Sequence, residues 1–152
     1  MKKIIFFFVL VVFGIFLYYF FSDSYRYSLE AKAYYEMGNY QKAYKLANDA
    51  YKLDKYNRMA FTIVTQSKIA IDWEKFIKES EEYFNQIDKI SNKETITKAD
   101  KIKIKMMLEI IMGEYKNLKH SKLLNKDLED SAQIQYKKAK ELYDGIFKKR
   151  NN

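Results

Sequence analysis

The side chains that could carry out acid–base or metal chemistry in this sequence are few and scattered. His120 is the only histidine, and no cysteine is present to share a metal with it. Glu81-Glu82 and Glu129-Asp130 are adjacent acidic pairs, whose members point to different sides of a helix. Neither a glycine-rich phosphate loop nor a serine nucleophile elbow occurs. We therefore expect no catalytic, cofactor-binding or metal-binding residues, and no enzyme.

Composition and charge narrow the fold and the partners. The 152 residues include no proline and only four glycines, which favours long helices in a chain with room for one domain. The net charge is +8, but lysines and acids are interleaved along most of the chain, as on a solvated helix face. The basic excess is strongest at Lys148-Lys149-Arg150, so a wall polymer or anionic headgroups remain an alternative ligand class.

The N-terminal segment indicates the compartment. Residues 4–21 are free of charge and follow Lys2-Lys3. A run of this length suits a helix that crosses about 30 Å of hydrocarbon, and Ser22-Asp23-Ser24 is a poor cleavage site. We predict an uncleaved signal-anchor over 4–21 in the inner (cytoplasmic) membrane, with residues 1–3 in the cytoplasm and the remaining chain in the periplasm. An exported domain meets little nucleic acid, so none is expected as a partner.

The rest of the chain is predicted to be all-α. Gly38-Asn39 suits a left-handed helix end, Asp72 an N-cap, and Thr97 with Asp100 a capping box. The helix expected after this capping box has an apolar set that includes Ile102, Met106, Ile110 and Leu118. The expected helices form three hairpins and span about 24–37, 40–53, 58–71, 72–90, 97–118 and 126–148.

Small and aromatic residues alternate in the first hairpin at spacings that packing requires. Ala43 and Ala50 lie two turns apart on one face of their helix, and small residues allow backbones to approach. Gly38 allows the turn, and Tyr40 can pack back across it. The segment therefore predicts a closely packed helix–turn–helix unit.

This pattern resembles the tetratricopeptide repeat (TPR), a 34-residue helix–turn–helix unit that stacks into solenoids. The resemblance implies one repeat over 24–57, a degenerate repeat over 58–91 and a TPR-like C-terminal hairpin over 97–149. Lys55 replaces the usual proline, Ala47 stands where an aromatic is common, and Phe76 and Tyr83 replace two alanines of the second repeat. The implied repeat-packing residues are Tyr27, Ala31, Tyr34, Gly38, Tyr40, Ala43, Ala50, Phe61 and Trp73.

TPR arrays bind peptides or partner proteins, usually along the concave surface formed by their first helices. Carried onto this chain, the resemblance implies a partner-binding surface. Its members are Tyr25, Ser28, Lys32, Tyr35 and Glu36, with Thr62, Gln66 and Ile69 as equivalents in the second repeat. An alternative is that Tyr25 and Tyr35 cover the membrane-proximal surface or pack between hairpins.

The chain also resembles small membrane-anchored bacterial TPR-like proteins of the cell envelope. That resemblance implies a scaffold or adaptor, such as a structural component of a flagellar motor or secretion machine. The expected partners are other envelope proteins or a peptide segment of one, in a homo- or hetero-oligomer. The alternatives are a periplasmic chaperone-like adaptor for exported clients and a wall- or anionic-surface-binding module.

Overall fold

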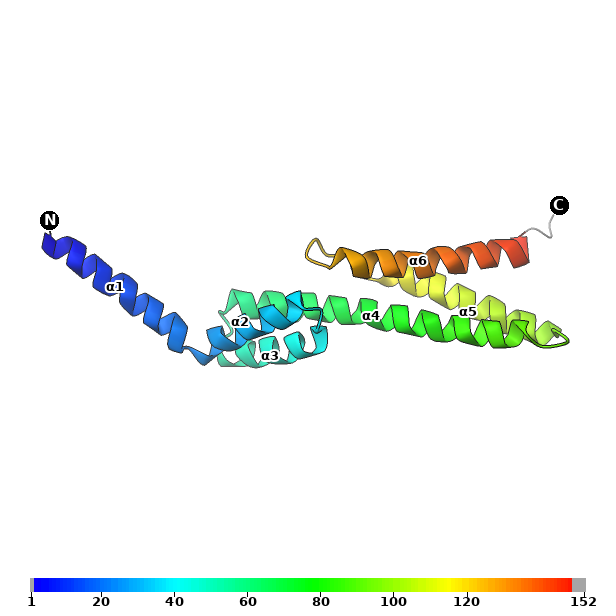
Figure 1. Cartoon of the computed structure of the whole chain (residues 1–152), viewed down its shortest axis with the longest axis horizontal. Coiled ribbons are helices and arrows are strands. Elements are labelled where there is room, and N and C mark those ends of the chain that lie inside the picture. Colours follow the sequence, from blue (N-terminus) through cyan, green and yellow to red (C-terminus); the bar gives the residue numbers. More distant parts are fainter. Residues whose placement is uncertain (1, 149–152) are drawn as a thin grey trace. The chain divides into compact units, whose positions relative to one another are not determined.

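The structure, a computed structural model, describes residues 2–148, of which 2, 3 and 19–21 by backbone only, and every regular element in this range is a helix. This confirms the all-α prediction. The chain divides into two compact units, one up to Lys68 and one from Ile69 on. The elements are α1 (Lys2–Phe21), α2 (Asp23–Glu36), α3 (Tyr40–Leu53), α4 (Arg58–Ser91), α5 (Lys98–Asn117), α6 (Lys126–Tyr143) and a π-helical turn, Asp144–Lys148 (Figure 1).

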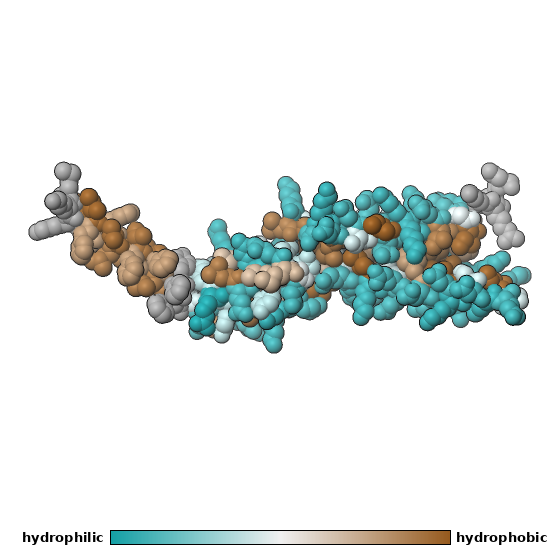
Figure 2. Space-filling view, in the orientation of Figure 1, coloured by the Kyte–Doolittle hydropathy of each residue, from teal (hydrophilic) through white to brown (hydrophobic). Residues whose placement is uncertain are grey.

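Helix α1 is apolar and its described side chains, from Ile4 to Tyr18, are exposed, as its brown surface in Figure 2 shows. Among the described residues, no single helix is long and apolar enough to pass as a membrane span. Ile4–Tyr18 and Asp23–Glu36 pass together, as a pair bent by 66°, on length and composition alone. An apolar N-terminal segment is thus confirmed, whereas the span over 4–21 and its orientation stay predictions.

Helices α2 and α3 form the hairpin expected from the sequence. Gly38 has a φ of +79°, which confirms the left-handed helix end. The Gly38 N–H donates to the Tyr35 carbonyl and the Asn39 N–H to the Tyr34 carbonyl. These two bonds form a Schellman motif, which gives the last carbonyls of α2 hydrogen-bond partners. The Asn39 side chain then caps α3.

Alanines line the interior of the first unit. Ala31 of α2 and Ala43 and Ala47 of α3 are fully buried together with Ile63 of α4. Their small side chains let the helix backbones approach closely. Ala47, which stands where TPR units often carry an aromatic, is thus part of the core.

Helix α4 corrects the predicted organisation. Residues 58–91 form one helix of 34 residues, so the break expected at Asp72 is wrong and there is no second hairpin over 58–91. The physical reason is a buried stripe that continues through the expected break at steps of three and four residues, without a glycine to reverse the chain. Its members are Ala60, Ile63, Ser67, Ala70, Trp73, Phe76, Ser80, Phe84 and Ile87.

The second unit contains α5, α6 and the part of α4 from Ile69 on. Thr97 and Asp100 form the predicted capping box at the start of α5. Leu108 and Ile111 of α5 are fully buried, as is Ala132 of α6. The predicted last helix is α-helical only to Tyr143 and continues as the π-helical turn.

Candidate functional site

The surface predicted on α2 is only partly available. Lys32 and Glu36 are exposed and pair with each other, their charged atoms 3.7 Å apart. Tyr25 and Tyr35 are half-buried. The Tyr35 ring packs edge-on against the Tyr40 ring, with centroids 5.3 Å apart. Burial raises the pKa of Tyr35, and the neighbouring Tyr40 raises it further. Lys32 and Glu36 are therefore the polar part that a partner could reach.

Ser28 does not belong to that surface, which corrects the prediction. It is fully buried, and its hydroxyl donates to the Ser24 carbonyl at 2.8 Å. The Asn57 side-chain amide donates to both serine hydroxyls, to Ser24 at 2.9 Å and to Ser28 at 2.8 Å. Ser28 is thus a structural residue that joins α2 to the start of α4.

The positions implied by the second repeat lie along α4 instead of on a separate hairpin helix. Thr62 is exposed, and its hydroxyl donates to the Arg58 carbonyl within the same helix. Gln66 and Ile69 are half-buried. Because α4 is continuous, these residues do not line the first helix of a second repeat.

The implied packing residues divide into buried and exposed groups. Tyr40, Ala31, Ala43 and Ala50 are buried, and Trp73 is buried in the second unit. Phe61 is 56% exposed, although its ring lies 5.7 Å from that of Tyr51. The half-buried rings of Tyr27 and Tyr34 each have a cation over their face, from Arg26 at 5.7 Å and Lys42 at 3.9 Å.

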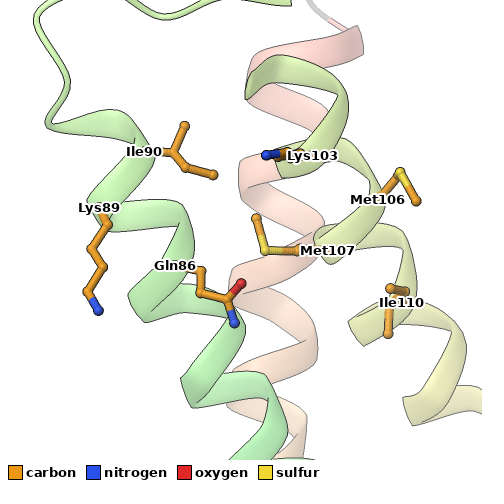
Figure 3. Close-up of a pocket in the computed structure, with 7 residues that line it drawn as sticks. All are labelled: Gln86, Lys89, Ile90, Lys103, Met106, Met107 and Ile110. Carbon is orange, nitrogen blue, oxygen red and sulfur yellow. The ribbon is translucent and has the colours of Figure 1, made fainter. Parts of the chain in front are cut away.

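The second unit contains an apolar groove between α4 and α5 that the sequence did not predict. Figure 3 shows Ile90 of α4 and Met107 of α5 pointing into the space between the two helices. The groove has a volume of about 430 Å³. Its lining residues are Gln86, Lys89 and Ile90 of α4 and Lys103, Met106, Met107 and Ile110 of α5.

Exposed apolar side chains extend this groove along α5. Ile102, Met106 and Ile110 follow each other at four-residue steps and are 60%, 56% and 37% exposed. This spacing places them in one stripe along the helix. Methionine adapts its shape to a ligand more readily than branched residues do. The stripe and the groove together form an apolar surface that no described residue covers fully.

The charged residues that line the groove are both basic. Lys89 and Lys103 are both exposed, and none of the seven lining residues is acidic. A second hollow between α4 and α5, of about 260 Å³, differs because Lys75 lies in it with Glu79 and Glu114. Burial, and to a smaller extent Glu79, raises the pKa of Glu114, whereas Lys75 opposes the shift. Of these two hollows, the first combines an apolar lining with charged residues that are all basic.

The one histidine packs against aromatic residues. The His120 ring lies 5.2 Å from that of Trp73, whose indole N–H donates to the Lys119 carbonyl at 2.8 Å. His120 Nδ1 is 3.8 Å from Glu129 Oε1, an acidic neighbour that the sequence did not indicate. Across the described residues, no group of three or more His, Cys, Asp or Glu side chains could hold a metal ion.

The basic tail is described only at its first residue. Lys148 Nζ lies 2.9 Å from Asp144 Oδ1, and this hydrogen bond raises the pKa of Lys148. Lys149 and Arg150 lie outside the described residues. The tail as an anionic-surface ligand therefore stays a prediction.

Searches against protein-family models, curated proteins and solved structures gave no match to this chain. The TPR resemblance therefore stays a prediction from the sequence. The groove was missed because Ile102, Met106 and Ile110 were grouped simply as the apolar set of their helix. In the fold the buried face of α5 is formed by Ile104, Met107, Leu108 and Ile111. A second apolar stripe beside the core stripe was the signal available in the sequence.

Proposed function

We propose that this protein is a membrane-anchored adaptor whose helical domain binds a partner protein in the α4–α5 groove. The observation that supports the proposal most directly is the exposed apolar stripe of Ile102, Met106 and Ile110 beside the groove. Exposed large apolar patches typically mark sites of protein or membrane contact. The absence of an enzyme-like cluster in the sequence agrees with a binding role.

The partner segment that fits is an amphipathic helix with acidic residues beside its apolar face. Grooves between two helices accept such a helix through side chains at three- and four-residue steps. Met106, Met107 and Ile110 offer the apolar contact. Lys89 and Lys103 provide charge complementarity, which steers association and selects acidic partners.

Anchoring by α1 supports a role in assembly at the cell envelope. A protein held on a bilayer meets other proteins of that membrane at high effective concentration, so a modest contact is sufficient. We propose a periplasmic scaffold or adaptor subunit in an envelope assembly, of the kind found in flagellar-motor and secretion structures. The partner is accordingly an envelope protein or a segment of one.

The first experiment uses the intact chain in cells. Photo-crosslinkers at Met106 and Ile110 are expected to form adducts with one partner segment, and its sequence should show an apolar stripe with Asp or Glu beside it. Ile134 is the matched control because it is an apolar residue of α6, 62% exposed. A further crosslinker is placed at Lys32 of α2. Adducts from Lys32 and none from Met106 would overturn the groove as the binding site and favour the α2 surface.

A charge exchange then tests the occupant. A synthetic peptide of the crosslinked segment should bind the wild-type protein, and Lys103→Glu should weaken its binding roughly tenfold. Replacing a facing acidic residue of the peptide with Lys should restore binding to that variant. Equal binding of the peptide to wild type and Lys103→Glu would contradict an acidic partner.

A further inference from the structure

We infer that the α3–α4 loop is a second membrane contact, which lies in the headgroup region of the same bilayer that α1 enters. The contact surface consists of Leu53, Lys55, Tyr56 and Arg58. This inference rests on the membrane anchoring in the proposed function, but it does not depend on the groove or on any protein partner.

A buried hydrogen-bond network fixes the loop beside the end of α1. The Ser24 hydroxyl donates to the Ala50 carbonyl in the last turn of α3, at 2.9 Å. The Asn57 amide, at the end of the loop, donates to the hydroxyls of Ser24 and Ser28. Because α2 starts at Asp23, two residues after the end of α1, these bonds hold the loop at the membrane-proximal end of the hairpin.

The loop and the end of α1 share a hollow. It has a volume of about 600 Å³ and lies between Tyr18 on one side and Leu53 and Tyr56 on the other. If α1 is inserted in the bilayer, Tyr18 at its far end lies near the interface, and the loop residues lie at the same level. The hydrogen bonds of Ser24 hold the loop near the end of α1 without the help of any other protein.

The exposed side chains of the loop suit a lipid headgroup layer. Tyr56 is 93% exposed and Leu53 is 60% exposed, so neither contributes to the interior of the unit. Tyrosine is enriched at membrane–water interfaces because its ring is apolar and its hydroxyl is polar. A headgroup layer accommodates both side chains at one loop tip.

The charges on the loop have the sign that anionic headgroups attract. Lys55 and Arg58 are exposed. The carboxylate of the loop, that of Asp54, directly precedes Lys55; it accepts the Tyr56 backbone N–H at 2.8 Å and holds the turn. Basic residues next to a membrane segment are attracted by the negative surface potential of anionic lipids.

The opposite end of the hairpin offers a matched control. Met37, in the α2–α3 turn, is 76% exposed and apolar, like the loop residues. Helix α2 has 14 residues, so Met37 lies about 20 Å farther along it than Ser24. A probe there has similar freedom but no route to the interface.

The experiment is depth-dependent fluorescence quenching. The chain has no cysteine, so an environment-sensitive fluorophore can be attached singly at Tyr56→Cys, Met37→Cys or Phe13→Cys. The full-length protein is reconstituted alone in vesicles of phosphatidylcholine and phosphatidylglycerol with nitroxide-labelled lipid headgroups or acyl chains. We expect headgroup nitroxides to remove roughly half of the emission at Tyr56→Cys and little at Met37→Cys.

The three labels separate the possible failures. Quenching at Phe13→Cys by acyl-chain nitroxides, with equal and weak quenching at Tyr56→Cys and Met37→Cys, would overturn the loop contact and leave the anchor standing. An unquenched Phe13→Cys would overturn both the anchor and the loop contact. In a positive result, Lys55→Gln with Arg58→Gln should lower the quenching at Tyr56→Cys on anionic vesicles to the level on neutral ones.

Discussion

At the scale of single residues, Asn57 connects two helices, α2 and α4, through one side-chain amide. Its Nδ2 donates to Ser24 and Ser28 of α2, and its Oδ1 accepts the Ala60 N–H, which caps the start of α4. Asn57 follows the loop after α3, and its side chain is fully buried. Few polar side chains satisfy so many buried partners at once, and this makes Asn57 costly to replace.

We predict that Asn57→Ala lowers the free energy of unfolding by about 2–4 kcal/mol, because it removes a helix cap and leaves buried hydroxyls with fewer partners. Urea unfolding of the full chain in detergent measures this. Asn39→Ala is the matched control, since Asn39 caps α3 from an exposed position. It should cost only about 1 kcal/mol. Equal losses for the two variants would show that the buried network contributes nothing.

The second prediction at this scale concerns acid. The pKa of Asp100 lies well below its ordinary value of 3.8, because the Lys93 ammonium and the Thr97 hydroxyl and N–H all donate to its carboxylate. A lowered pKa in the folded state means that the stabilisation is fully present above about pH 4 and is lost as the pH falls below it.

Asp100→Asn should therefore reduce the loss of stability between about pH 5 and about pH 2, while it lowers the stability near neutral pH. Urea midpoints of wild type and variant across this range measure the difference. Asp88→Asn, at an exposed site of α4, serves as the control. Parallel pH profiles of wild type and Asp100→Asn would contradict the role of this carboxylate.

Local signals explain why some residues could be predicted. Gly38 and the Thr97–Asp100 box act within four residues of themselves, and a sequence displays such relations directly. The partners of Asn57 lie 29 and 33 residues away. A pairing over that distance depends on how helices pack, so Ser28 was wrongly placed on the surface.

At the scale of elements, the length of α4 could not be predicted from the helix-cap pattern of the sequence. Asp72 was interpreted as a cap because aspartate favours helix starts, yet aspartate is also tolerated inside a helix. The regular burial of Ala70, Trp73 and Phe76 across that site was visible as spacing in the sequence. The TPR resemblance predicts two helices within each 34-residue repeat and therefore a break near Asp72.

The two apolar stripes of α5 show a different limit. Ile104 and Leu108 are buried, whereas Ile102 and Met106 are exposed, although all four are suitable core residues. Which stripe faces the interior depends on the position of α4 and α6. The groove could therefore not be predicted from the periodicity of α5 alone.

Replacing either of two glycines with alanine should change the free energy of unfolding, in opposite directions. Gly113 lies inside α5, and a Cβ added there meets no atom within 4 Å, so Gly113→Ala should raise the free energy of unfolding by roughly 0.5–1 kcal/mol. Gly38 has a φ of +79°, so Gly38→Ala should lower it by about 1 kcal/mol. Thermal unfolding of both variants measures the pair. A loss of stability in Gly113→Ala would indicate a contact of α5 that the structure lacks.

At the scale of the whole molecule, the chain folds as two units with separate cores. Ala31 and Ala43 belong to the first, and Leu108 and Ile111 to the second. The sequence predicted an all-helical chain and the first hairpin, because these follow from local spacing, but it divided α4 into two helices. It did not predict the division, because the boundary lies within an unbroken helix, between Lys68 and Ile69.

Separate cores should open separately. Leu108 is fully buried, and Leu108→Ala should destabilise the second unit by about 2–5 kcal/mol. Hydrogen exchange with mass spectrometry should then show faster exchange in α5 and α6, with α2 and α3 close to the wild-type rate. Equal acceleration in all four helices would mean that the two units unfold as one.

Trp73 gives the molecule a built-in optical signal for one of its halves. It is the only tryptophan, it is 1% exposed, and its ring lies in the second unit against Tyr115 and His120. Light absorbed selectively by tryptophan will therefore report only on the part of the chain from Ile69 on. The opening of that half can be followed by emission without any label.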